Sequence, residues 1–78
     1  HQRKPMTYLK LTRVHLTIQG ELKEDYLYVN PQHIRVFSEH YEDNFEMFVT
    51  AISWAHPQYM EIYVKETPYQ IEQQLTLS

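Results

Sequence analysis

The chain has 78 residues, no cysteine and a formal net charge of −3 at pH 7, which allows one small domain and excludes disulfides and thiolate zinc sites. Its longest apolar run is far below the ~20 residues of a membrane-spanning helix, so we expect no membrane span. Acidic residues outnumber Lys and Arg by 10 to 7, which makes nucleic acid an unlikely class of partner.

The first five residues lack the apolar stretch of a signal peptide and precede Met6, which is placed like a natural initiator. We interpret residues 1–5 as a tag remnant or a disordered lead. Residues 6–78 then form a single small β-rich domain, which we expect to be cytoplasmic.

Residues 8–18 alternate between apolar and polar side chains and predict one long strand. The apolar phase changes between Leu11 and Val14, which predicts a bulge near Thr12-Arg13 or a sharp bend. Gly20, the only glycine, marks the turn that follows.

Residues 21–25 are charged except for Leu22 and are expected to form a solvated return, whereas residues 26–29 predict a second strand. Asn30 and Pro31 end this strand in a tight turn, because proline cannot donate to a strand ladder. Residues 34–37 predict a third, short strand.

Residues 38–44 are polar and acidic, and their composition predicts a hairpin loop. The fourth strand is predicted over residues 45–54, with apolar side chains on both faces. A strand of this kind is central in its sheet or covered on both faces. Residues 55–58 turn the chain into a fifth strand.

The fifth strand, residues 60–65, is followed at once by a predicted helix. Thr67 offers its hydroxyl as N-cap, Pro68 suits the first helical position, and Gln70 completes a capping box. These segments together predict a mainly β (α+β) fold, in which a five-stranded meander curls into a small open barrel with one short C-terminal helix.

Three short motifs resemble the FlbD/SwrD-like family of small proteins, which are often encoded in bacterial flagellar operons and have bacterial and phage relatives. These motifs are Leu11-Thr12-Arg13, then Tyr28-Val29-Asn30-Pro31 with His33-Ile34, and finally Val64-Lys65-Glu66-Thr67 before the helix. The resemblance implies a compact β-rich domain of bacterial or phage origin without enzymatic activity, in the host cytoplasm if phage-encoded.

Aromatic and cationic residues of the predicted strands form the first candidate site. They occupy positions that can share one outer sheet surface: Tyr26, Tyr28, Arg35, Tyr63 and Lys65. Tyrosine and arginine are enriched at protein interfaces, so we expect a surface for self-association or for a partner protein. The same combination also resembles a platform for single-stranded nucleic acid, which the acidity of the chain disfavours.

Carboxylates around His40 and Tyr41 form the second candidate: Glu39, Glu42, Asp43 and Glu46. A hairpin tip that gathers them could bind a cation or a basic partner. A solvated loop that keeps the hairpin soluble is the simpler interpretation.

We predict no catalytic residue, no cofactor and no metal site. The histidines lack the close spacing of zinc ligands, and no nucleophile stands in a recognisable motif. The sequence therefore predicts a non-enzymatic interaction module that forms a homo-oligomer and binds a partner protein. The alternatives are a phage-encoded oligomer that holds a small signalling molecule or nucleotide between subunits, and a single-stranded nucleic-acid binder.

Overall fold

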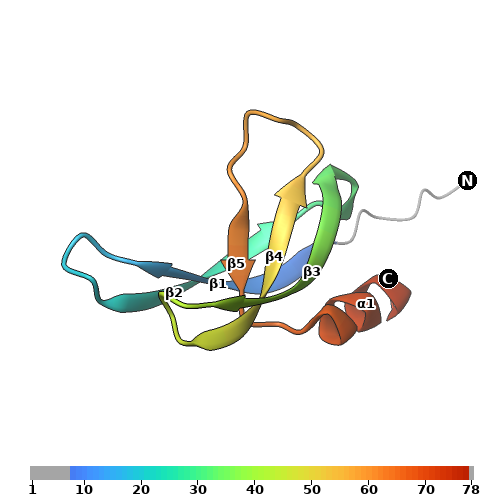
Figure 1. Cartoon of the computed structure of the whole chain (residues 1–78). Helices are drawn as coiled ribbons and strands as arrows, with labels where there is room; N and C mark the ends of the chain where they lie inside the picture. Colours follow the sequence, from blue (N-terminus) through green and yellow to red (C-terminus); the bar gives the residue numbers. More distant parts are fainter. Residues whose placement is uncertain (1–7, 78) are drawn as a thin grey trace, which may run out of the picture.

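An antiparallel five-stranded sheet and one helix make up the computed structural model, which describes residues 8–77 (Figure 1). In chain order the elements are β1 (Leu9–Leu16), β2 (Leu22–Val29), the short 3-10 helix η1 (Pro31–His33), β3 (Ile34–Glu42), β4 (Met47–Trp54), β5 (Ile62–Val64) and α1 (Pro68–Leu77). The predicted mainly β fold with one short C-terminal helix is confirmed. The interpretation of residues 1–5 concerns residues outside the described part.

The strands lie side by side in the order β2-β1-β5-β4-β3. β2 and β3 follow each other in the chain through η1, yet they form the two edges of the sheet. The sheet is therefore not closed, so the predicted curling fits it loosely. The predicted meander is wrong, because β2 and β3 are not neighbours and β5 lies between β1 and β4. β5, only three residues long, joins the β1–β2 hairpin to the β3–β4 hairpin.

β1 and β2 pair in continuous register from Leu9 opposite Val29 to Leu16 opposite Leu22, so the predicted bulge in β1 is wrong. The change of apolar phase has another cause. β1 is an internal strand that buries Leu11 on one face and Val14 on the other. β2 also begins four residues earlier than predicted, because β1 supplies backbone partners for its polar residues.

The predicted loop is wrong for residues 38–42, since β3 continues through Glu42, and right for residues 43 and 44, which lie in the turn. Its polar half pairs with β4, from His40 opposite Val49 to Glu42 opposite Met47. An edge strand is paired on one side only and can consist largely of polar residues. The polar composition of residues 38–42 therefore did not reveal the strand. The irregularity of the sheet lies between Ile34 and Val36 of β3.

β4 buries Val49 on one face and Ile52 on the other, which confirms that it is internal and covered twice. β5 begins only at Ile62, and Met60 is 84% exposed rather than part of the strand. Successive side chains of a strand point to opposite faces, so the register divides the sheet into two faces. We call the face that carries Leu11 and Ile52 the core face, and the opposite one the outer face.

α1 packs on the core face by burying Ile71 completely. Its first turn has the predicted capping box: the Thr67 N–H donates to Gln70 Oε1 at 2.9 Å, and the Gln70 N–H donates to Thr67 Oγ1 at 3.1 Å. The side-chain amide of Gln74 pairs with the backbone of Lys10 as a neighbouring strand would. It accepts from the Lys10 N–H at 2.9 Å and donates to the Lys10 carbonyl at 3.0 Å. The helix is thus tied to the edge of β1 that faces β5.

The main core lies on the core face and joins strands of both hairpins to α1. Its buried members are Leu9, Leu11, Val29, Ile52, Val64 and Ile71, with partly buried apolar residues packed around them. Burial of this kind is worth on the order of 1.5–3 kcal/mol for each large apolar side chain. The main core therefore holds the two hairpins in one body.

Candidate functional site

The register places four of the five predicted interface residues on the outer face. Tyr28 and Tyr26 lie opposite Lys10 and Thr12 of β1, and Tyr63 lies opposite Val14. Lys65 follows Tyr63 by two residues and forms an ion pair with Glu24 at 3.1 Å. Four predicted residues therefore share a face.

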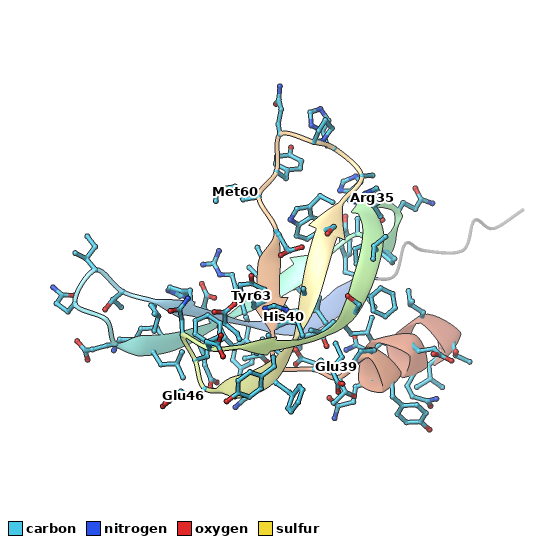
Figure 2. All side chains as sticks on the ribbon, in the orientation of Figure 1. Arg35, Glu39, His40, Glu46, Met60 and Tyr63 are labelled. Carbon is cyan, nitrogen blue, oxygen red and sulfur yellow. The ribbon has the colours of Figure 1, made fainter. Side chains whose placement is uncertain are left out.

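Arg35, the fifth predicted residue, lies apart from these four. It is exposed and occupies the irregular position between Ile34 and Val36 of β3. Figure 2 shows Arg35 near the loop between β4 and β5, well away from Tyr63. The structure does not join it to the tyrosines.

Tyr26 and Tyr28 stand on the free edge strand β2, and the side chain of each is 68% exposed. The Lys10 ammonium lies 5.0 Å from the centre of the Tyr26 ring, within cation–π range. The Lys65 N–H donates to the Thr12 carbonyl, so even-numbered residues of β1 direct their backbone groups toward β5. The residues opposite them in β2, including both tyrosines, consequently direct their backbone groups toward the open edge.

The acidic residues predicted as a cluster are divided by the strand geometry. Glu39 lies opposite Thr50 on the core face, whereas Glu42 lies on the outer face. Asp43 and Glu46 belong to the turn after β3, where Glu46 has a positive φ of 54°. Figure 2 shows Glu39 beside α1 and Glu46 at the far turn, so the four carboxylates do not gather.

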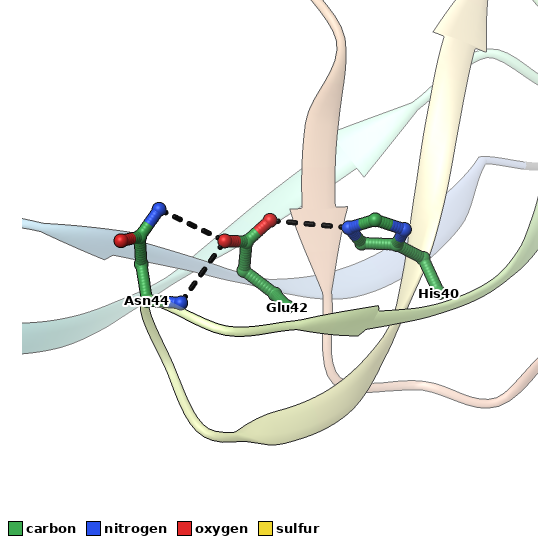
Figure 3. Close-up of polar contacts among 3 residues, drawn as sticks. All are labelled: His40, Glu42 and Asn44. Atoms are coloured by element: carbon green, nitrogen blue, oxygen red, sulfur yellow. Dashed lines mark hydrogen bonds and ion pairs between the residues drawn. The ribbon is translucent and has the colours of Figure 1, made fainter.

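Among these four carboxylates, Glu42 takes part in a network of polar contacts, which Figure 3 shows. Its Oε1 lies 3.1 Å from His40 Nε2, and its Oε2 accepts from the backbone and side-chain nitrogens of Asn44 at 3.1 and 2.9 Å. The hydrogen bond from the Asn44 backbone, followed by the one from His40, holds the pKa of Glu42 below its usual value. Glu42 is therefore ionised and oriented.

Tyr63 lies beside this network on β5. Its ring stacks on His40, with centroids 5.3 Å apart, and meets the edge of Phe45 at 5.7 Å. Burial, followed by the negative charges of Glu42 and Glu61, raises the pKa of the Tyr63 hydroxyl. The carboxylates of Glu42 and Glu61 thus both favour the protonated form of the Tyr63 hydroxyl.

A cleft of about 480 Å³ opens beside Tyr63, and we call it the arm cleft. It lies between the second half of β1 and the chain that enters β5. Its lining comes from three segments: residues 13–16, then Glu42, Asn44 and Phe45, then residues 60–63. Glu42 and Tyr63 were predicted as site residues, whereas Glu61 and Phe45 were missed.

Glu61 and Tyr63 are two residues apart in the predicted fifth strand, so their side chains point to the same face. This spacing was the one signal in the sequence that could have placed Glu61 beside the tyrosine. No signal indicated Phe45, because it reaches Tyr63 through the turn between β3 and β4. Among residues 8–77, no three His, Asp or Glu side chains are grouped closely enough to hold a metal ion. None of the described helices has the length and apolarity needed to cross a membrane.

No protein-family model, curated protein or solved structure matches this chain. The candidate site is therefore described by its own geometry alone. It has two parts: the exposed tyrosine edge of β2 and the acidic, aromatic arm cleft.

Proposed function

We propose that this chain is a non-enzymatic interaction module, which self-associates through the open edge of β2 and binds a partner protein elsewhere on its surface. The observation that carries the proposal is the position of Tyr26 and Tyr28. Their rings are mostly exposed, and their backbone groups point to an unpaired strand edge. Large exposed aromatic side chains at an open edge are typical of association surfaces.

Two of the three charged residues of β2 are already paired within the chain, which favours association, whereas Lys23 has no ion-pair partner among the described residues. The Arg13 guanidinium forms a bidentate ion pair with the Asp25 carboxylate, with hydrogen bonds of 3.0 and 2.6 Å, and Lys65 forms an ion pair with Glu24. A second copy that approaches this edge meets little unbalanced charge. The edge is therefore better suited to pairing than its many charged residues suggest.

β3, the other edge, is less suited to pairing with a second sheet. Its ladder is irregular at Arg35, and it carries Glu39, which has no ion-pair partner among the described residues. Irregular pairing and charged side chains are features that block edge-to-edge association. β2 is consequently the edge that we assign to self-association.

Antiparallel pairing of β2 with β2 of a second copy would join two five-stranded sheets around a two-fold axis. In such an isologous contact the same residues of both copies form the interface, so each tyrosine would contact the second copy. The rings of Tyr26 and Tyr28 from both copies would then lie on one continuous outer face. The combination of backbone pairing and aromatic contact explains why this edge carries tyrosines.

Light scattering after size-exclusion chromatography, at protein concentrations of about 10–100 µM, tests the proposal. We expect the unaltered protein to form dimers, and Tyr26→Ala with Tyr28→Ala to shift it to monomers with an unchanged circular dichroism spectrum. Tyr69→Ala is the matched control, because Tyr69 is also 68% exposed but lies on α1. A monomeric unaltered protein over the whole range would contradict self-association.

The expected origin and location remain part of the proposal. We infer a bacterial or phage protein of the cytoplasm from the resemblance to the FlbD/SwrD-like family. Fractionation of the source cells, with an antibody against the chain, tests the location. Recovery in the membrane or in the exported fraction would contradict it.

A further inference from the structure

We propose that the arm cleft docks an extended segment of the partner protein by receiving one arginine side chain between its aromatic wall and its carboxylates. This inference rests on the proposed binding of a partner protein and names the chemistry by which that partner is recognised. It does not depend on self-association.

The walls of the arm cleft suit a planar cation on an apolar stem. Leu16 and Ile62 provide apolar surface, and the rings of Phe45 and Tyr63 meet edge to face at 5.7 Å. A guanidinium group stacks on tyrosine or phenylalanine rings and packs its methylenes against apolar side chains. The volume of about 480 Å³ exceeds what one arginine side chain needs.

The charges of the arm cleft point to a cation. Glu42 and Glu61 line it, and both raise the pKa of Tyr63 through their negative charge. The oxygens of Glu42 are oriented by His40 and Asn44, and Glu61 accepts a hydrogen bond from Ser53 at 3.1 Å. Carboxylates held in this way suit the fork of hydrogen-bond donors that arginine offers.

Arg13 also lines the arm cleft, but its guanidinium is engaged by Asp25. No ion pair with Lys or Arg is found for Glu42 or Glu61 among the described residues. The cleft thus keeps an unbalanced negative charge, which opposes a nucleotide phosphate and attracts a basic partner.

The backbone of β1 favours a polypeptide as the occupant. β1 pairs with β5 only at Arg13 and Val14, and continuing this register would place Leu16 opposite Glu61. That pair is not formed, and the period of two directs the backbone groups of Leu16 into the gap. An extended segment can pair with such groups while its side chain enters the cleft.

A synthetic dodecapeptide of glycine, serine and three arginines is the probe, and its matched control replaces each arginine by citrulline, which keeps the shape and removes the charge. Titration of the ¹⁵N-labelled full chain at low salt should shift the amide signals of residues 13–16 and 60–63 with the arginine peptide only. Binding should weaken steeply as salt is raised.

Two conservative variants locate the contact. We expect Glu42→Gln to weaken peptide binding about tenfold and Glu61→Gln, which is more exposed, about threefold. Glu72→Gln on α1 is the matched control and should leave binding unchanged. Because Glu61 is exposed, its variant is expected to fold even if removal of the Glu42 charge disturbs the turn.

Several results would overturn this inference: equal binding of the citrulline peptide, shifts confined to other residues, or equal affinities of the Glu61→Gln and unaltered chains. Tight binding of a nucleotide at the same amides would also overturn it. The outcome is separable from self-association, since a monomeric protein that binds the peptide refutes only the dimer. A dimer without peptide binding refutes only the arginine site.

Discussion

The imidazole of His40 lies parallel to the ring of Tyr63, with centroids 5.3 Å apart and an interplanar angle of 9°. The two residues belong to β3 and β5, so the stack crosses β4, which lies between these strands. Val49, the partner of His40 in β4, is only 3% exposed. The outer face thus has a small packed cluster of its own, next to the arm cleft.

Alkaline titration tests the setting of Tyr63. Its pKa is raised in the folded state, so its protonated form contributes stability that is full below the unfolded value of about 10 and is lost as pH rises through the raised value. Urea unfolding between pH 8 and 11 should show this decline in the unaltered chain. We expect a smaller decline in Tyr63→Phe, whereas Tyr69→Phe should behave as the unaltered chain does.

Acid titration tests the contact between Arg13 and Asp25. The hydrogen bond from Arg13 lowers the pKa of Asp25, so its contribution is full above the unfolded value of about 3.9 and is lost as pH falls through the lowered value. Asp25→Asn should therefore be less stable than the unaltered chain at pH 7 and should lose less stability on acidification. Equal acid profiles in urea unfolding would contradict this role, and Asp43→Asn serves as control.

Removal of Glu66 should destabilise the junction between β5 and α1. Its carboxylate accepts from the Thr12 N–H at 2.7 Å and from the Thr12 hydroxyl at 2.9 Å, and its carbonyl accepts from the buried Thr50 hydroxyl. Glu66→Ala should lower the free energy of unfolding by about 1–3 kcal/mol, because it leaves the Thr12 donors without a partner. Glu72→Ala on the exposed side of α1 should change it by less than about 0.5 kcal/mol, as is usual for surface sites.

The helix cap can be tested with two threonines of the same region. Thr67→Ala removes the hydroxyl that accepts from the Gln70 N–H, and we expect a loss of about 1 kcal/mol. The Thr76 hydroxyl donates only to the Glu72 carbonyl within α1, so Thr76→Ala should be nearly neutral. Thermal unfolding monitored by circular dichroism measures both, and equal losses would refute the importance of the cap.

Truncation of a core residue should be far more costly than truncation of an exposed one of similar size. Ile52 is fully buried in β4, whereas Phe48 of the same strand is 63% exposed. We expect Ile52→Ala to cost about 2–5 kcal/mol. Phe48→Ala should cost well under half of this, and urea unfolding of both variants measures the difference.

The sequence by itself determined the features whose causes lie within a few residues. The cap at Thr67 and Gln70 depends on two hydrogen bonds across one helical turn, and the end of β2 depends on Asn30, whose side chain accepts from the Gln32 N–H. The internal position of β4 also followed from its own apolar pattern. Local chemistry was sufficient for these predictions.

Only the tertiary structure decided the lengths of β2 and β3, because their polar residues become strand when a neighbour satisfies their backbone groups. It also decided the arm cleft, whose lining comes from residues 13–16, from Glu42, Asn44 and Phe45, and from residues 60–63. These segments meet because β5 pairs with both β1 and β4. Pairing between distant strands depends on the whole packed sheet, so no local pattern in the chain encodes it.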